Sequence, residues 1–270
     1  MTGPSNDKAT AFAALHHGPG FVLPNAWDAG SARVLEQVGF AAIATTSAGI
    51  AWSLGVPDGG ALDRDTMLDH VGRIAAAVRV PVTADLEAGY GETAEDVGHT
   101  VARAVELGVV GANLEDVGPD GLFGIEEAAD RIAAARAAAP RGTFVLNART
   151  DTYFAGGSGD VFAETVERAS RYVEAGADCV FVPGVVEEDT IRRLAEAIAC
   201  PLNIVAGLAN TIDAPTLFSL GVRRVSLGGS MARAIFSSLE RAGRELLESG
   251  TLGFLDGAIS YADLQRRFGA

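Results

Sequence analysis

Four acidic side chains in two short runs could together hold a cation. Asp85 and Glu87 lie in the run TADLEAG, and Glu115 and Asp116 lie in the run NLEDVG. Each run follows a segment with the composition of a buried β-strand, so the carboxylates should meet where neighbouring strands end. Like charges about 4 Å apart repel by about 4 kcal/mol at an effective dielectric of about 20, which makes a divalent metal the simplest partner. An all-oxygen ligand set favours Mg²⁺ or Mn²⁺ over Zn²⁺.

A competing interpretation of these acids is ordinary salt bridging at the rim of the fold. Arg149 is the obvious basic side chain there, and one arginine cannot neutralise all of them. Its planar guanidinium suits a substrate carboxylate, with pairing to Asp151 or a neighbouring acid as the alternative. Because side chains alternate along a strand, only one of Glu115 and Asp116 is expected to face a metal.

Eight short apolar segments are expected to be the strands that position these side chains. Ala-rich stretches with helical periodicity separate them, and several end at a glycine. Alternating strands and helices imply right-handed βαβ units, and eight units favour a closed (β/α)₈ barrel of the α/β class over an open dinucleotide-binding sheet. The expected strands are 21–27, 41–47, 82–88, 111–117, 143–149, 179–184, 202–207 and 224–229.

The chain is expected to form a single barrel domain over residues 1–270, with residues 231–270 as a C-terminal helical extension. Barrels of this length are routinely one domain, and no Pro, Gly or Ser-rich linker divides the sequence. The extension holds two helical segments, 231–250 and 255–268, whose surplus could pack on a sister subunit. The segment around Lys8 is expected to be flexible.

Composition argues against several classes of partner. A net charge of −14 without a basic run speaks against nucleic acid and anionic membranes. No apolar run approaches the length of a membrane span, and no basic-then-apolar start suggests a secretory signal, so a cytoplasmic location is expected. Cys179 and Cys200 are interpreted as structural free thiols without a disulfide.

The loops after the strands are where a barrel carries its chemistry. Polar or aromatic side chains expected there include Trp27 after the first strand, Ser47 after the second and Asn203 in the seventh. The second loop, residues 47–65, is long and glycine-rich and carries Asp58, so it is interpreted as a lid or a substrate clamp.

Missing residue types exclude other mechanisms. Lys8 is the only lysine and lies near the N-terminus, so a Schiff-base aldolase has no nucleophile. The four histidines lie in the N-terminal segment or in expected helices, which argues against a His-ligated zinc site. The four histidines are His16, His17, His70 and His99. The chemistry that remains is metal-assisted: a cation polarises a carbonyl or stabilises an enolate.

Four motifs occur in a characteristic order: TTSAGIAWSLGVPD, PVTADLEAGYG, NLEDVG and LNARTD. In that order and spacing, residues 20–235 resemble the isocitrate lyase and phosphoenolpyruvate mutase superfamily. The resemblance implies a (β/α)₈ barrel, commonly a tetramer in which the last helix swaps onto a neighbouring subunit. A homo-oligomer, either a dimer or a tetramer, is therefore expected.

The resemblance also implies roles for the acids. Asp85 becomes a direct or near-direct Mg²⁺ ligand, and Glu87 and Glu115 hold the metal partly through water. Asp58 becomes the loop acid near the metal. Glu87 replaces the aspartate that is more usual in the motif.

The substrate contacts follow in the same way. The resemblance implies that Ser47 and Ala48 present backbone N–H groups to a carboxylate or enolate oxygen of a 2-oxo acid. Arg149 would bind the substrate beside the departing group, and Trp27 and Asn203 complete the expected contacts. Such a site stabilises an enolpyruvate-like intermediate, with Asp58, Arg149 and Glu115 as its catalytic residues.

The loop after the fourth strand departs from the family pattern. Residues 116–127 read DVGPDGLFGIEE, where lyases carry a Lys-[Lys/Arg]-Cys-Gly-His loop and mutases and phosphonopyruvate hydrolases a Lys-Thr-Asn type loop. The leading hypothesis is a Mg²⁺-dependent lyase that cleaves a C–C bond next to a 2-oxo or 2-hydroxy carboxylate. It would resemble oxaloacetate decarboxylase or 2-methylisocitrate lyase. The alternatives are a C–P bond hydrolase or mutase, or a catalytically silent barrel that binds a 2-oxo acid.

Overall fold

Every expected strand contains an observed one. In the computed structural model, which describes residues 4–156, 159–209 and 211–269, most strands end earlier than expected because the chain turns into the site loops there. The first is divided by Pro24, whose missing N–H interrupts the ladder. The strands are β1 (Phe21–Leu23), β2 (Asn25–Ala26), β3 (Ile43–Thr45), β4 (Val82–Asp85), β5 (Gly111–Glu115), β8 (Val145–Arg149), β9 (Cys179–Phe181), β10 (Leu202–Val205) and β11 (Arg224–Ser226).

These strands form a parallel barrel. Their order is β1-β11-β10-β9-β8-β5-β4-β3-β2, and all the paired neighbours run parallel. Because β1 and β2 are consecutive pieces of one strand, the two ends of this order meet at Pro24 and close the barrel. The predicted (β/α)₈ fold is confirmed. A separate hairpin, β6 (Val117–Gly118) and β7 (Gly121–Leu122), follows β5.

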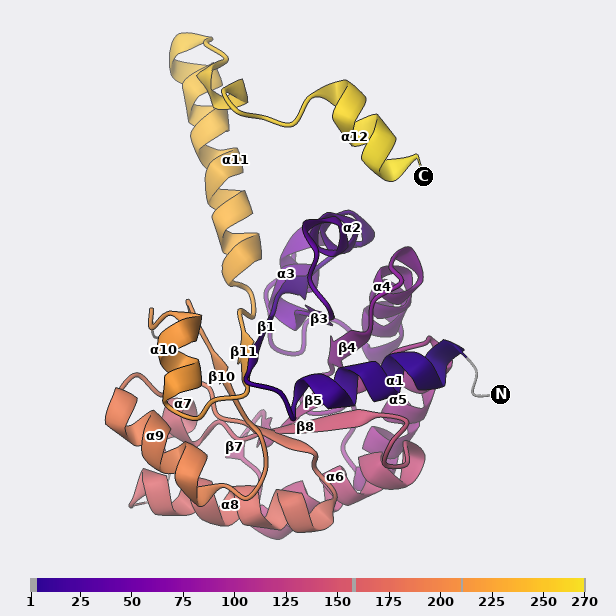
Figure 1. Cartoon of the computed structure of the whole chain (residues 1–270), viewed down its shortest axis with the longest axis vertical. Helices are drawn as coiled ribbons and strands as arrows, with labels where there is room; N and C mark the ends of the chain where they lie inside the picture. Colours follow the sequence, from indigo (N-terminus) through magenta and orange to yellow (C-terminus); the bar gives the residue numbers. More distant parts are fainter. Residues whose placement is uncertain (1–3, 157–158, 210, 270) are drawn as a thin grey trace.

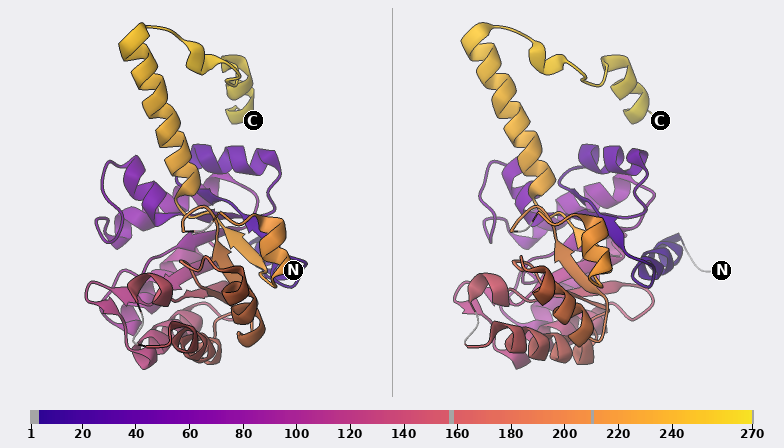
Figure 2. Two further views of the ribbon diagram at one scale, coloured as in Figure 1. Left: turned by 90° about the vertical axis from the view of Figure 1, so that its left-hand side faces the viewer. Right: turned by 60° about the vertical axis from the view of Figure 1, so that its left-hand side comes forward.

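Helices surround the barrel and bury one face each (Figure 2). In α5, for example, Val97, Val101 and Ala104 are fully buried at helical spacing, and Thr93 caps the helix by accepting a hydrogen bond from the Asp96 backbone N–H. The helices of this layer are α2 (Ala29–Val38), α4 (Arg64–Ala77), α5 (Ala94–Glu106), α6 (Ile125–Ala138), α8 (Val161–Ala175), α9 (Glu188–Ala197) and α10 (Ala214–Ser219), with a short α7 (Thr152–Ala155).

Two expectations about local structure were wrong. Residues 47–65 are not one long loop, because α3 (Ser47–Ser53) occupies their first part, with Thr46 accepting a hydrogen bond from the Gly49 N–H as its N-cap. The segment around Lys8 is helical, in α1 (Pro4–Leu15), which packs against the barrel through the fully buried Phe12. The ammonium group of Lys8 donates to the Val78 carbonyl at 3.3 Å.

The two cysteines match their interpretation. Both Cys179 and Cys200 are free thiols, and Cys179 is completely buried. Burial raises the pKa of the Cys200 thiol to about 12 and raises that of Cys179 as well. Neither sulfur is therefore a ready nucleophile.

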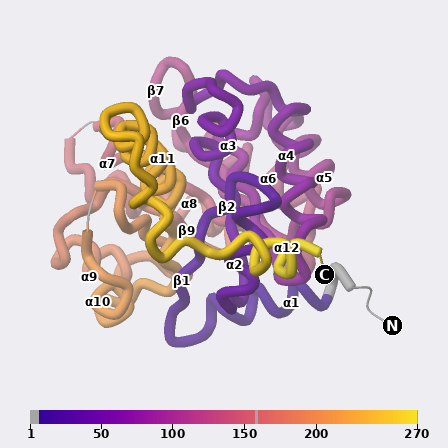
Figure 3. Tube along the Cα trace, turned by 90° about the horizontal axis from the view of Figure 1, so that it is seen from above, coloured from indigo at the N-terminus to yellow at the C-terminus, as the bar shows by residue number. Residues whose placement is uncertain are grey.

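The C-terminal extension leaves the barrel as an arm. It consists of α11 (Ser230–Ser249), a 3₁₀ turn η1 (Gly253–Leu255) and α12 (Tyr261–Phe268). The helix α11 projects from the barrel (Figures 1 and 2), and seen from above the chain returns over α2 (Figure 3). The side chains of Arg33 and Gln37 on α2 donate to backbone carbonyls at the end of α12. None of the helices within the described ranges is long and apolar enough to cross a membrane.

Candidate active site

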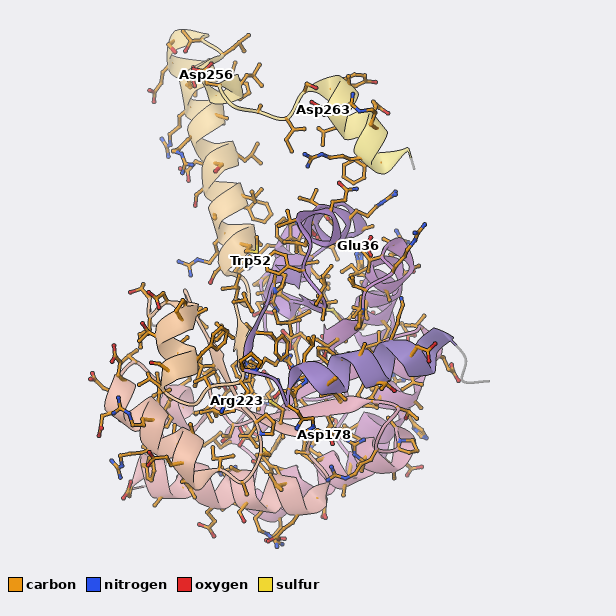
Figure 4. All side chains as sticks on the ribbon, viewed as in Figure 1. Glu36, Trp52, Asp178, Arg223, Asp256 and Asp263 are labelled. Carbon is orange, nitrogen blue, oxygen red and sulfur yellow. The ribbon has the colours of Figure 1, made fainter. Side chains whose placement is uncertain are left out.

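A small cavity of about 180 Å³ lies at the C-terminal ends of the barrel strands. One side is polar and includes Asp58, Asp85, Asn113 and Arg149; the other is apolar and includes Phe181, Pro183, Val205 and Leu208. Trp52 of α3 also lines it, beside the first turn of α11 (Figure 4). A pocket with one polar and one apolar side suits a small polar acid with an apolar portion.

Asp85, at the end of β4, has one oxygen occupied and one available. Its Oδ2 accepts hydrogen bonds from the backbone N–H and the hydroxyl of Ser47, both at 3.1 Å. Its backbone N–H donates to the Thr45 hydroxyl. Its Oδ1 is buried and has no hydrogen-bond partner among the described residues. Buried polar atoms are almost always paired, so this oxygen is suited to a ligand such as a hard divalent cation.

Glu87 sits in a turn that is unusual for its residue type. Its φ is 48°, in the left-handed region that side chains other than glycine rarely adopt, and Tyr90 at 56° is similar. The Tyr90 hydroxyl donates to Glu87 at 2.7 Å. Burial raises the pKa of Glu87; the Tyr90 bond opposes this, and the charges of Asp85 and Asp58 add to it.

The buried guanidinium of Arg131 fixes the loop that follows Glu87. It donates to the backbone carbonyls of Gly91 and Glu92 and lies over the ring of Phe123, with the guanidinium carbon 4.1 Å from the ring centroid. The loop that follows the two left-handed residues is therefore held by Arg131 of α6, which itself stacks on Phe123 just after β7. Loops stabilised in this way commonly serve function.

Glu115 and Arg149 form an ion pair at the edge of the cavity. Arg149 Nη1 lies 2.7 Å from Glu115 Oε2, and its Nε donates to Asp151 at 2.9 Å. Pairing with Asp151, left open by the sequence, is therefore observed. Burial raises the pKa of Glu115 to about 8; Arg149 opposes this rise, and the charges of Asp151, Asp85 and Glu87 add to it. Arg149 also lines the cavity and can meet a substrate carboxylate there.

The expected acids do not form a ready-made metal cluster. Nowhere in the described part of the chain do three His, Cys, Asp or Glu side chains come close enough together to hold an ion. Asp85 lines the cavity, whereas the nearest partners of Glu87 and Glu115 are Tyr90 and Arg149. The three acids thus do not surround one point among the described residues, and their roles toward a metal stay predictions.

Asp58 reaches the cavity from the loop between α3 and α4. Burial and then the charge of Asp85 raise its pKa, and a bond from Ser47 opposes the rise. A carboxyl group in this state holds its proton more readily than an exposed one. The cavity therefore contains a candidate proton donor.

The two expected backbone donors differ from each other. The Ser47 N–H donates to Asp85, while Ser47 itself lines the cavity, so its contact with a substrate stays a prediction. Ala48 lines the cavity in the first turn of α3. Backbone N–H groups in a first turn have no intrahelical partner, so the Ala48 N–H stays a candidate donor.

Trp27 and Asn203 do not line the cavity. Trp27 is partly buried and packs against Gly49 of α3. Its Cβ lies 2.9 Å from the point that a Cβ atom on residue 49 would occupy. Asn203 is fully buried in the barrel interior, and its Nδ2 donates to the Ile204 carbonyl of its own strand and to the Arg224 carbonyl and Ser226 hydroxyl of β11. The expected substrate contacts of Trp27 and Asn203 stay predictions.

Asp116 faces away from the cavity, as strand alternation predicted. Its carboxylate accepts from the Tyr172 hydroxyl at 2.6 Å, from Arg168 at 3.2 Å and from the Asp151 backbone N–H at 2.9 Å. The last bond links this buried group to the residue that holds Arg149. Asp116 is thus part of the support of the site.

Asn113 lines the cavity although the sequence did not single it out. It lies two residues before Glu115 in the same strand, so the alternation that placed Glu115 inward also places Asn113 inward. Asn113 is uncharged and lies in an acidic motif, so its residue type gave no signal of metal binding or proton transfer.

Comparison with known proteins places this geometry in context. The sequence model of the phosphoenolpyruvate phosphomutase family matches residues 12–247. An uncharacterised protein of Mycobacterium tuberculosis is 37% identical over 258 residues, which cover 95% of each chain. The 2-methylisocitrate lyase of Aeropyrum pernix is 31% identical over 242 residues, covering 85% of this chain and 76% of the lyase.

Solved structures show the same similarity. A Burkholderia cenocepacia J2315 protein provisionally named a lyase/mutase has a TM-score of 0.94 at 41% identity, covering 99% of this chain and 98% of its own. A phosphonopyruvate hydrolase bound to oxalate and Mg²⁺ has a TM-score of 0.87 at 27% identity, covering 97% and 95%. The second structure holds a metal and a dicarboxylate together.

Proposed function

The chain belongs to the phosphoenolpyruvate phosphomutase family, whose superfamily contains lyases, mutases and hydrolases, and on that premise we propose that it is a Mg²⁺-dependent lyase. Its substrate would be a small 2-oxo or 2-hydroxy carboxylate, cleaved at the C–C bond next to that group. The observation that carries the proposal is Asp85, whose Oδ1 is buried at the edge of the cavity and has no hydrogen-bond partner among the residues that the structure describes.

The residues present fit a divalent metal. Asp85 would hold it directly, and Glu87 and Glu115 would hold it partly through water. Bound there, Mg²⁺ or Mn²⁺ would supply electrophilic stabilisation of negative charge on a substrate oxygen. Burial and then neighbouring carboxylates raise the pKa values of Asp58, Glu87 and Glu115, and a divalent cation beside them would favour their ionised forms.

The protein's own groups would bind and protonate the substrate. The Arg149 guanidinium, fixed by Glu115 and Asp151, would bind a carboxylate, and the Ala48 N–H would bind an oxygen of the acid. Asp58 would hold a proton for the carbon from which the leaving group departs. Its raised pKa favours that protonated form.

The β6–β7 hairpin favours decarboxylation or a simple retro-aldol cleavage. It stands where lyases of the family carry the catalytic cysteine, and Phe123 directly after it accepts a hydrogen bond from Arg168 and stacks with Arg131. A departing CO₂ needs no proton donor, so decarboxylation requires least from this loop.

The test is a ¹H and ³¹P NMR time course of the purified protein with oxaloacetate, 2-methylisocitrate, isocitrate and phosphonopyruvate, each with Mg²⁺ and with EDTA. We expect metal-dependent pyruvate from oxaloacetate or 2-methylisocitrate above the background without protein. The co-product, CO₂ or succinate, names the bond broken. Metal-independent rates would contradict the proposal.

C–P cleavage is the second candidate, favoured by the similarity to phosphonopyruvate hydrolase and by the missing lyase loop. Metal-dependent phosphate from phosphonopyruvate in the same time course would select it. Tight binding of these acids without turnover would instead indicate a binding-only barrel.

We also propose that the protein is a homo-oligomer, a dimer or a tetramer. Along α11 only Ala232 is buried, while large apolar side chains are exposed. A long helix with an uncovered apolar face is typical of a protein interface. The exposed side chains on α11 are Ile235, Phe236, Leu239, Leu246 and Leu247.

A further inference from the structure

A row of polar side chains crosses the barrel interior beneath the cavity. It contains Asn113 of β5, Asn147 of β8, Asn203 of β10 and Arg224 of β11, all of them buried. Asn113 pairs in register with Asn147, and Asn203 with Arg224. Hydrogen bonds connect all four, so the orientation of each amide can be deduced from its partners.

The row is anchored at Asn203. Its Nδ2 lies 3.0 Å from the Ile204 carbonyl and 3.1 Å from the Arg224 carbonyl. A backbone carbonyl can only accept, so the atom that faces these oxygens must be the amide nitrogen. The Asn203 Oδ1 is thereby turned toward Asn147, at 3.0 Å from its Nδ2.

Asn147 must therefore donate, and it donates twice. The same Nδ2 lies 2.7 Å from Asn113 Oδ1. Arg224 reaches that oxygen independently, with Nη2 at 3.0 Å, and a guanidinium has no acceptor atom. Two unrelated donors thus require an oxygen at this position of Asn113, and the opposite amide orientation is excluded.

The consequence is that the Asn113 Nδ2 is turned away from the row. Asn113 lines the cavity, and no hydrogen-bond partner for this nitrogen occurs in the parts of the chain that the structure describes. Its neighbour in register on β4 is Asp85. The amide thus offers two N–H donors on the polar side of a cavity whose other groups there include two acids, Asp58 and Asp85.

We propose that Asn113 is a substrate-contacting residue whose amide donates to a carboxylate or carbonyl oxygen of the bound acid, with Arg224, Asn147 and Asn203 as positioning residues. The ligand class rests on the proposed function. An N–H group cannot ligate a metal, so Asn113 serves the substrate and not the cation. A neutral donor also attracts an anion without neutralising the carboxylates that the metal needs.

Calorimetric titration with oxalate at saturating Mg²⁺ tests this, with Mg²⁺ alone titrated into the same variants. Asn113→Ala should weaken oxalate binding by about 10- to 100-fold, the usual effect of losing a hydrogen bond to a charged group, and leave Mg²⁺ affinity within about 3-fold. Asn113→Asp keeps the oxygen for Arg224 and Asn147 and exchanges only the nitrogen. It should fold and bind oxalate more weakly still.

Unchanged oxalate affinity in a folded Asn113 variant would overturn the assignment. A matching loss of Mg²⁺ affinity in Asn113→Ala would overturn it too, because the residue would then act through the metal. Failure of the wild-type protein to bind oxalate with Mg²⁺ would contradict the proposed function itself, and with it the ligand class assigned to Asn113. The wild-type and variant titrations therefore separate the two failures.

Discussion

Asp85 differs from the acids around it in how its two oxygens are used. Ser47 holds one from two sides, which fixes the carboxylate, and the other is buried without a partner within the described ranges. Glu87 and Glu115 each already have a partner, and their raised pKa values reflect burial and mutual repulsion. The sequence predicted this convergence of acids, but it could not show that Tyr90 and Arg149 would take two of them.

Asp58 is the residue to which the proposed function assigns the proton. Asp58→Asn should lower turnover by about 100-fold or more, because the side chain can no longer donate or accept a proton at that point. Mg²⁺ affinity should change by less than about 10-fold if Asp85 is the main ligand. The measurement is the steady-state rate on the accepted substrate together with Mg²⁺ calorimetry.

Asp130→Asn is the matched control for Asp58→Asn. It makes the same change of charge at an exposed position on α6. It should leave rate and metal affinity unaltered. Near-normal turnover in Asp58→Asn would remove Asp58 from the mechanism.

Among the secondary-structure elements, the strands could be predicted from the sequence. Which of their inward-facing side chains reach the cavity could not. Apolar segments and intervening helical periodicity identified the strands, and alternation correctly turned Asp116 outward. Alternation decides whether a side chain faces into the barrel, but it does not say how far below the mouth it lies. Asn113 lines the cavity, whereas Asn203 is fully buried and reaches only Ser226, which lines it.

The segment after the second expected strand shows a different limit of prediction from the sequence. Residues 47–53 contain a glycine and follow a strand, so they were interpreted as loop. The structure shows α3, because Thr46 caps it and Ile50 and Ala51 bury its inner face. Burial against the barrel outweighed the local preference.

The contact of Asp116, the residue after β5, with α8 supports the site from behind. Asp116→Asn should lower the free energy of unfolding by about 1.5–3 kcal/mol, because it removes the charged partner of a hydrogen bond from the buried Arg168, which keeps its second ion pair with Glu164. Tyr172→Phe removes only a hydrogen bond to the same group and should lower it by about 1 kcal/mol. Urea unfolding monitored by circular dichroism measures both, and equal losses would argue against a buried ion pair as the main contribution.

The packing around α1 is expected to make the stability of the fold depend on pH. His16 is buried with its ring centroid 4.9 Å from those of Phe12 and Phe21. Burial, and then the charge of Arg224, lower its pKa to about 3. Below the ordinary value of about 6.5 the unfolded chain gains a proton that the folded chain does not, so stability is lost as pH falls from 6.5 toward 3.

His16→Gln removes this titration and keeps an N–H group for the Phe12 carbonyl. The difference in unfolding free energy between wild type and His16→Gln should change by about 1.4 kcal/mol between pH 7.5 and 5.5, with the wild type losing more. Denaturant unfolding at the two pH values measures it. His99→Gln, at an exposed position, is the control, and a pH-independent difference for His16→Gln would contradict the buried neutral histidine.

For the whole molecule, the arm is the feature without an intramolecular explanation. The end of α12 touches α2 through Arg33 and Gln37, while the apolar residues of α11 face outward. We propose that residues 231–270 are an extension of one barrel domain and that a second copy covers them. The sequence suggested this surplus, but one chain cannot show its partner.

Replacing both Leu246 and Leu247 by Glu tests that interface. Leu247 is 87% exposed, so charge there costs the isolated chain little, whereas charge in an apolar interface is costly. Light scattering after gel filtration should give a multiple of the chain mass for the wild type and a single chain for the variant. Ser238→Glu, at an exposed polar position on α11, should keep the wild-type mass. A monomeric wild type would contradict the proposed assembly.

The most direct measurement is the thermal unfolding of the wild type and of Asp85→Asn, each with Mg²⁺ and with EDTA. We predict that Mg²⁺ stabilises the wild type, by about 2.7 kcal/mol when its concentration is 100 times the dissociation constant, and leaves the variant unchanged. In EDTA the variant should be at least as stable as the wild type, because one charge has been removed from beside Asp58, Glu87 and Glu115. Equal stabilisation of both proteins by Mg²⁺, or of neither, would contradict a metal site built on Asp85.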